Sequence, residues 1–245
     1  MDSVEVIVLG CGDAFGSGGR FQAAIFVDLK PGAFLFDCGA TTLIALKKLG
    51  IDPKGLGLVL VSHLHGDHIA GLPFLFLEYQ FLTPREGPLF VAGPPGIRDR
   101  IEGLFHLMYP DVAAMERRFQ VEYVELEAGR WKKLQAVEVL PLHVHHQPNS
   151  YGYKVRVEEK VIAYSGDTAW TEALVELADG ADLFISECYL YESRSEVHLS
   201  YPDLVANRGR LNCRRLLLTH LHAEMVGKLD QLAFEAAHDG MRLEV

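Results

Sequence analysis

A short cluster of metal-binding side chains at His63–His68 (sequence HLHGDH) constrains this chain more than any other feature. It directly follows the apolar run 58–62, which predicts a buried strand that ends at the cluster. Imidazole and carboxylate groups are common ligands of divalent cations, and in an extended segment His63 and His65 point the same way. Gly66 permits a tight turn that would carry the two residues after it to a neighbouring position. We therefore expect a metal site at the end of this strand.

A second group of histidines lies at 143–146, where three of four residues are histidine. A strand through 139–145 would place His143 and His145 on one face and His146 on the other face or in the following turn. The spacing alone leaves open which of the three joins the metal site.

Composition narrows the class of protein. The 245 residues include 23 Lys+Arg and 33 Asp+Glu, a formal charge of −10, which argues against a sequence-independent nucleic-acid binder. The four cysteines are far apart and form no CxxC pair, so neither a disulfide scaffold nor a cysteine zinc site is expected. The start of the chain lacks the pattern of a signal peptide, and no apolar run could span a bilayer. These features predict a cytoplasmic protein with no membrane association.

Short apolar strands and helical patterns alternate along the chain without a linker. Strands are expected at 4–9, 23–29, 33–36, 58–62, 121–126, 137–141, 151–157, 161–165, 183–186 and 215–219, and helices at 41–49, 171–178, 201–208 and 224–238. Segment 84–118 is the least regular. Two sheets packed face to face with helices outside fit this pattern, in one domain over residues 1–245.

Four motifs give the chain a specific resemblance. The HxHxDH cluster is accompanied, in order, by Leu35–Gly39 (LFDCG), 164–168 (YSGDT) and 218–220 (LTH). Together they resemble the metallo-β-lactamase-fold hydrolases over nearly the whole chain. The resemblance implies an α+β fold, an αββα four-layer sandwich of two mixed sheets, with a two-metal site along one edge of the sheets.

The resemblance also implies a set of seven ligands around two divalent cations. Its members carry nitrogen or oxygen donors: His63, His65 and His146 on one cation, Asp67, His68 and His220 on the other, and Asp167 bridging both. A donor set without cysteine suits Zn²⁺, with Mn²⁺ or Fe as alternatives.

Two of these ligands have competitors nearby. The family pattern places one ligand six residues before the glycine of a Tyr-Gly-Tyr segment, which favours His146 over His145. His220 directly ends the last apolar run and is preferred to His222, two residues further on.

Glu187, at the end of a predicted strand, and His198, eleven residues later, resemble the phosphodiesterase branch of the family. That branch includes ribonuclease Z and small cyclic phosphodiesterases. The resemblance implies that a metal-bridging hydroxide, oriented by Asp67, attacks phosphorus while His198, with Glu187 as its partner, protonates the leaving oxygen. The alternative for His198 is a surface residue in a charged loop.

The substrate class is a separate question. Ribonuclease Z carries a long arm between its third histidine and its bridging aspartate, but here the interval from His146 to Asp167 is only 21 residues. We therefore expect a small or cyclic phosphate diester as substrate, and a homodimer on general frequency. The alternatives are tRNA 3′-end cleavage, hydrolysis of a thioester or lactone, and a metal-binding accessory role.

Five arginines of the irregular segment 84–118 are either phosphate contacts or part of a solvated charged face: Arg85, Arg98, Arg100, Arg117 and Arg118.

Overall fold

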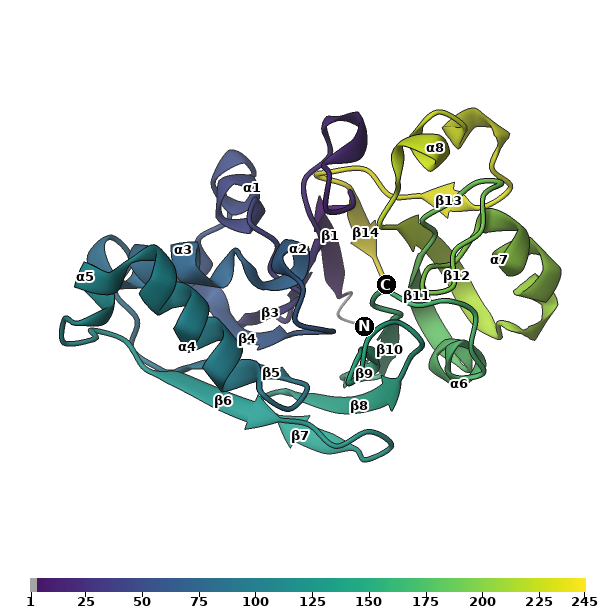
Figure 1. Ribbon diagram of the computed structural model, residues 1–245. Helices are drawn as coiled ribbons and strands as arrows, with labels where there is room; N and C mark the ends of the chain where they lie inside the picture. Colours follow the sequence, from purple (N-terminus) through teal and green to yellow (C-terminus); the bar gives the residue numbers. More distant parts are fainter. Residues whose placement is uncertain (1–3) are drawn as a thin grey trace.

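The computed structural model describes residues 4–245 and arranges their fourteen strands in two sheets (Figure 1). The first sheet consists, in spatial order, of β14 (Arg242–Glu244), β1 (Glu5–Gly10), β2 (Ala24–Asp28), β3 (Ala33–Phe36), β4 (Leu56–Leu60), β5 (Leu89–Gly93) and β6 (Val121–Glu125). The second consists of β13 (Glu235–Ala236), β12 (Cys213–Thr219), β11 (Ala181–Glu187), β10 (Lys160–Tyr164), β9 (Tyr151–Val157), β8 (Val137–His143) and β7 (Lys132–Leu134).

Both sheets are mixed and follow the same plan. From β14 to β3 and from β7 to β10, neighbouring strands are antiparallel. From β3 to β6 and from β10 to β13, they are parallel. Parallel neighbours bring their carboxyl ends to the same edge, so side chains that follow successive strands are collected there.

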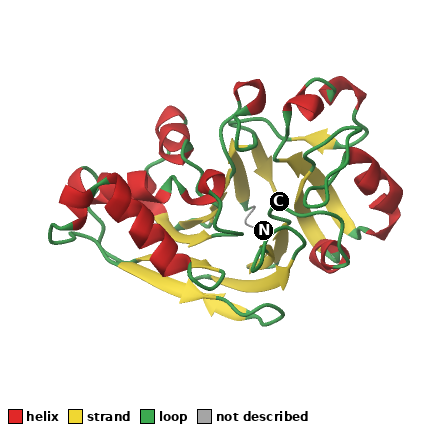
Figure 2. Ribbon diagram, viewed as in Figure 1, coloured by secondary structure: helices red, strands yellow, loops and turns green. Residues whose placement is uncertain are grey.

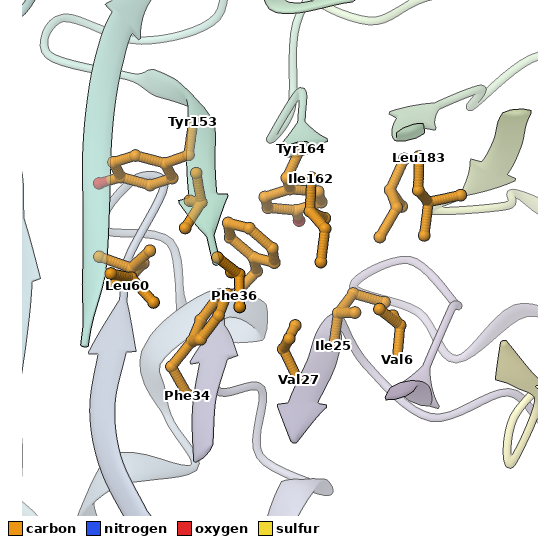
Figure 3. Close-up of a cluster of buried hydrophobic side chains, with 14 of the residues drawn as sticks. Val6, Ile25, Val27, Phe34, Phe36, Leu60, Tyr153, Ile162, Tyr164 and Leu183 are labelled. Carbon is orange, nitrogen blue, oxygen red and sulfur yellow. The ribbon is translucent and has the colours of Figure 1, made fainter. Parts of the chain in front are cut away.

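The core between the sheets is built from alternate residues of the strands, those whose side chains face the other sheet (Figure 3). Phe36 of β3 is fully buried, and its ring centroid lies 5.2 Å from that of Tyr164 and 6.4 Å from that of Tyr153. In β1, Val6 joins this core whereas its neighbour Ile7 packs on the opposite face. This two-residue alternation, apolar on both faces, is typical of a sheet covered on both sides.

Helices cover the two outer faces (Figure 2). The helices are α1 (Thr42–Lys48), α2 (Gly66–Ile69), α3 (Leu72–Phe81), α4 (Ile97–Met108), α5 (Pro110–Ala113), α6 (Ala173–Ala178), α7 (Tyr201–Asn207) and α8 (Ala223–Val226). Helices α1, α3 and α4 pack on the first sheet, and α6 and α7 pack on the second. The layers are therefore helices, sheet, sheet and helices, as the αββα prediction requires. Within residues 4–245, no helix has the length and apolar character needed to cross a membrane.

The prediction of a long helix over 224–238 is wrong. Only α8 is helical there; a 3₁₀ turn at Leu229–Gln231 and the short strand β13 follow it. Residues Glu235 and Ala236 pair with Leu217 and Leu218 of β12, and this tertiary pairing outweighs the local helical pattern. The predicted strand through 139–145 also ends early, at His143. Strands β5, β7 and β14 were not predicted. Strands β7 and β14 are three-residue edge strands with weak periodicity, and β5 is a five-residue internal strand within the irregular segment 84–118.

Candidate metal centre

Four strands deliver the chemistry-bearing residues to one edge of the molecule. His63 lies just beyond β4 of the first sheet, whereas Asp167 and His220 lie just beyond β10 and β12 of the second. Glu187 is the last residue of β11, between these two strands. Since β10, β11 and β12 are parallel, their carboxyl ends supply three functional groups side by side.

Three imidazoles converge into the first group of candidate ligands. His63 Nε2 lies 3.0 Å from His65 Nδ1, and His146 Nε2 lies 3.3 Å from the same atom. Nitrogen ligands in a tetrahedral zinc site, about 2.0–2.1 Å from the ion, lie roughly 3.3 Å apart. The spacing of the three nitrogens therefore fits one cation.

The second group combines two carboxylates with two imidazoles. Asp67 Oδ2 lies 3.3 Å from His68 Nε2 and 3.4 Å from His220 Nε2. Asp167 Oδ2 lies 3.4 Å from both of these nitrogens. All four side chains have a ligand atom within 4.8 Å of the others, so they could hold one ion together.

Unsatisfied buried atoms provide an independent test of this fit. His68 Nε2 and Asp167 Oδ1 are buried and have no hydrogen-bond partner among the residues that the structure describes. Leaving such atoms unpaired in the interior is costly, whereas coordination of a cation would satisfy the His68 nitrogen and would bring a positive charge next to the Asp167 carboxylate. The residues at this edge therefore fit divalent metal ions.

The pKa values of the two groups follow from burial and from each other's charge. Burial lowers the pKa of His63 well below its usual value, which favours the neutral imidazole that binds metals. Burial alone would raise the pKa of Asp167, but His220 and His68 outweigh it and hold this pKa well below its usual range. Asp167 is therefore an anion surrounded by ligand nitrogens.

Asp37 holds the second group in place, and this role was not predicted from the sequence. Its fully buried carboxylate accepts hydrogen bonds from the Ser62 backbone amide (2.7 Å), the Ser62 hydroxyl (2.8 Å) and the Tyr164 hydroxyl (2.8 Å). It also lies 2.7 Å from His68 Nδ1, which directs the other ring nitrogen of His68 to the ligand cluster. The sequence signal that could have indicated this role is the position of Asp37, a charged residue directly after the buried strand 33–36.

The turn before Asp167 requires a glycine. Gly166 has a φ of +58°, a left-handed conformation that side chains disfavour. A Cβ at this position would lie 2.7 Å from the Tyr151 carbonyl oxygen and 2.8 Å from Ser62 Cβ. The close approach of these segments positions Asp167 between strands of both sheets.

Glu187 and His198 meet next to the metal-ligand cluster. His198 Nδ1 lies 3.1 Å from Glu187 Oε1, and the imidazole stacks on the Tyr189 ring at 4.4 Å between centroids. Glu187 also accepts hydrogen bonds from the backbone amides of Thr168 and Leu199. Burial, followed by repulsion from Asp167, raises the pKa of Glu187 well above its usual range. Burial lowers the pKa of His198, which makes its imidazolium a stronger acid.

The competing histidines lie elsewhere. His145 is exposed and belongs to none of the ligand groups formed by residues 4–245, whereas His146 belongs to two. His143 is exposed and packs beside Tyr151. His222 accepts a hydrogen bond from the Glu224 backbone amide at the start of α8. These positions favour His146 and His220 for the cluster.

A cavity adjoins this edge on the side of the first sheet. It has a volume of about 620 Å³ and is lined by Leu64, which lies between two candidate ligands, by the Pro95–Gly96 turn and by α4. Its volume is in the range of small-molecule sites.

Comparison with known proteins assigns the family. A family model described as anti-Pycsar protein Apyc1 matches residues 4–212. The chain belongs to this family. The Apyc1-family chain is also 30% identical to the ribonuclease Z of Methanothermobacter thermautotrophicus, an alignment that covers 96% of this chain and 91% of that protein.

Solved structures agree on the fold. The metallo-β-lactamase-fold protein YhfI from Bacillus subtilis superposes with a TM-score of 0.79 at 22% identity, over the full length of both chains. The Zn²⁺-bound PqqB from Methylobacterium extorquens superposes with a TM-score of 0.77 at 15% identity, covering 98% of this chain and 100% of that one. The predicted metallo-β-lactamase fold is confirmed.

These comparisons establish the class of enzyme. The Apyc1-family chain is a metal-dependent phosphodiester hydrolase related to ribonuclease Z. This confirms the predicted family and reaction class and removes the accessory-protein alternative. His/Asp clusters that could hold metal ions are present at the predicted edge.

Proposed function

We propose that the enzyme hydrolyses a small or cyclic phosphate diester at a centre of two divalent cations. The observation that carries the proposal is the position of Asp167. Its Oδ2 atom lies 3.8 Å from His63 Nε2 and 4.0 Å from His146 Nε2, as well as 3.4 Å from His68 and His220. A carboxylate shared by two ligand sets is the arrangement that a two-cation centre needs.

The proposed ligands divide between the two cations in the same way as the two groups of side chains described above. One cation would be held by His63, His65 and His146, the other by Asp67, His68 and His220, and both by Asp167. We expect Zn²⁺, with Mn²⁺ and Fe as the alternatives, because all donors are nitrogen or oxygen. When bound, the cations would supply Lewis acidity that lowers the pKa of water and offsets charge on phosphoryl oxygens.

The side chains around the ligands have their own roles in the proposal. Asp67 orients the attacking water through its carboxylate. His198 protonates the leaving oxygen through Nε2, because Nδ1 is engaged by Glu187. Glu187, fixed by two backbone amides, keeps the imidazole in this orientation.

Three observations support a small substrate. The interval between His146 and Asp167 is occupied by β9 and β10, an antiparallel pair, which leaves no room for an RNA-binding arm. The adjoining cavity has about 620 Å³, enough for a small phosphodiester. The net charge of −10 disfavours a polyanionic substrate.

The second candidate function is cleavage of tRNA 3′ ends. The observation in its favour is the similarity to proteins named ribonuclease Z. We further propose that residues 1–245, of which residues 1–3 lie outside the described structure, form a single hydrolase domain that acts as a cytoplasmic homodimer.

Metal analysis and substrate assays on one sample test the proposal. We expect two metal ions per chain and hydrolysis of bis-p-nitrophenyl phosphate. On a diester whose leaving group is an alkoxide, which must be protonated as it departs, the His198→Ala variant should lower kcat by about 10²–10⁴ at unchanged metal content, because it removes a general acid. His143→Ala, a change at an exposed histidine outside the cluster, serves as the matched control.

Other outcomes would redirect the assignment. Efficient cleavage of precursor tRNA with poor turnover of small diesters would favour the second candidate. Two metals with turnover only on thioesters or lactones would contradict a phosphodiester substrate. Fewer than one metal ion per chain would mean that the ligand assignment is wrong.

A further inference from the structure

The arginines of segment 84–118 divide into two sets in the folded protein. Arg98 and Arg100 lie on α4. Arg85, Arg117 and Arg118 instead line one cavity of about 270 Å³. The remaining wall of this cavity consists of Glu86, Gly87, Phe119 and Gln120.

This cavity lies at the opposite edge of the first sheet from the metal centre. Its lining residues 85–87 precede β5, and residues 117–120 precede β6. The cavity is therefore at the amino ends of the parallel strands β4, β5 and β6, whereas His63 follows the carboxyl end of β4. Its occupant would not be the group that reacts at the metal centre.

Two of the three guanidinium charges are uncompensated. Arg117 pairs with Glu102 through two hydrogen bonds of 2.8 Å. The carboxylate on the cavity wall, Glu86, pairs with Lys54 at 3.2 Å. Neither Arg85 nor Arg118 forms an ion pair with any carboxylate in the part of the chain that the structure describes.

Arg85 also lacks acceptors for most of its donors. Its guanidinium stacks over the Tyr79 ring at 4.5 Å from the centroid, and one terminal nitrogen donates to the Pro88 carbonyl oxygen at 3.3 Å. The Nε and Nη1 atoms are buried and have no acceptor within residues 4–245. Unsatisfied donors of this half-buried guanidinium are unfavourable. A small shift of the Arg85 side chain toward the adjoining cavity would let an oxyanion there supply the acceptors it lacks.

We propose that this cavity is a second ligand site, which binds the phosphoryl group of a small phosphate compound between Arg85 and Arg118. A phosphoryl dianion matches the two free charges, whereas a single carboxylate would compensate only one. Guanidinium groups bind phosphate oxygens in a bidentate manner, and the stacking on Tyr79 restricts the orientation of one of them. The site is apart from the metal centre, so this inference does not depend on the proposed substrate.

Arginine side-chain signals in the magnetic resonance spectrum of isotope-labelled, metal-loaded protein provide a direct test. Inorganic phosphate should shift the Nε–Hε signal of Arg85, which is assigned by its loss in Arg85→Gln. Calorimetric titration should show a phosphate-binding event that Arg85→Gln and Arg118→Gln each weaken by at least about tenfold, since each removes a charge-assisted contact. Arg98→Gln, an exposed arginine outside the cavity, should leave this event unchanged.

The spectrum of the unmodified protein keeps the test valid even if a variant fails to fold. A shift of the Arg85 signal that sodium chloride reproduces equally well would overturn the proposal, because it would reflect ionic strength alone. Phosphate binding that persists in both cavity variants would place the anion at the metal centre and overturn it too. The phosphoryl group could belong to free phosphate or to a phosphate monoester, and parallel titrations with inorganic phosphate and with glycerol 3-phosphate distinguish these two ligands. Tighter binding of glycerol 3-phosphate identifies a phosphate monoester as the ligand.

Discussion

At the scale of single residues, Asp37 fixes the orientation of the candidate metal ligand His68. Its carboxylate contacts His68 Nδ1 at 2.7 Å and is itself held by Ser62 and Tyr164. Asp37→Asn preserves the shape but removes the charge, so we expect metal affinity to fall about 10–100-fold. Competition with a chromophoric chelator would measure this loss.

The control for Asp37→Asn is Asp28→Asn, at the end of β2, where the carboxylate accepts, among residues 4–245, only from the Lys30 backbone amide. Asp28→Asn should bind metal as the unmodified protein does. Equal metal affinity in both variants would show that Asp37 has no part in positioning His68.

Gly166 offers a second prediction at this scale. Gly166→Ala places a Cβ 2.7 Å from a carbonyl oxygen, whereas the Cβ of Gly180→Ala, at a similar φ of +70°, meets no atom of the described residues within 4 Å. Gly180→Ala should cost about 1–2 kcal/mol of unfolding free energy for the left-handed backbone alone. Gly166→Ala should cost roughly 1–3 kcal/mol more from overpacking and should also reduce metal content, because it displaces Asp167. Denaturant unfolding and elemental analysis would measure both effects, and equal losses of stability would refute the steric argument.

At the scale of elements, α4 is joined to β6 and to the segment before it by one polar cluster. Glu102 of α4 accepts from Arg117 at 2.8 Å and from the Tyr123 hydroxyl at 2.7 Å. Burial alone would raise the pKa of Glu102, but these donors outweigh it and lower the pKa. The carboxylate form is therefore the one that stabilises the folded protein.

The pH dependence of stability follows from this direction. The stabilisation by Glu102 should be complete above its unfolded pKa of about 4.3 and should disappear as the pH falls through the lower folded value. Because the pair is partly exposed, we expect Glu102→Gln to cost about 1 kcal/mol at neutral pH and nothing in strong acid. Denaturant unfolding at several pH values would test this. Glu127→Gln, which breaks an exposed pair with Arg130, should change stability by less than about 0.5 kcal/mol at any pH.

At the scale of the whole molecule, the aromatic core between the sheets joins the two halves of the chain. Phe36 comes from the first sheet, and its ring neighbours Tyr153 and Tyr164 come from the second (Figure 3). Phe36→Ala should cost about 3–5 kcal/mol of unfolding free energy, because it leaves a cavity at this interface. Denaturant unfolding followed by fluorescence and by circular dichroism would measure the loss.

Phe81 provides the matched comparison, since its side chain is 51% exposed whereas Phe36 is fully buried. Phe81→Ala should change stability by less than about 0.5 kcal/mol. A similarly small effect of Phe36→Ala would show that the sheets do not depend on this core.

Much of the fold could be predicted from local pattern. Strands such as Ala33–Phe36 and Tyr151–Val157 have the predicted bounds, because their apolar alternation is strong and turn residues flank them. The region 224–238 could not be predicted in this way. Its residues have helical spacing, but Glu235 and Ala236 pair with the edge of β12 as a strand. Local periodicity carries no information on pairing with a segment that is distant in the sequence.

The sequence by itself determined the family, the four-layer fold and the reaction class, because the HxHxDH cluster and the later motifs each lie within a few residues. Only the tertiary structure decided which residues meet. It separated His146 from His145, gave Asp37 its contact with His68, and placed three of five similar arginines around one cavity. Such relations depend on distances between segments far apart along the chain. Those distances are set by strand order and sheet packing rather than by neighbouring residues.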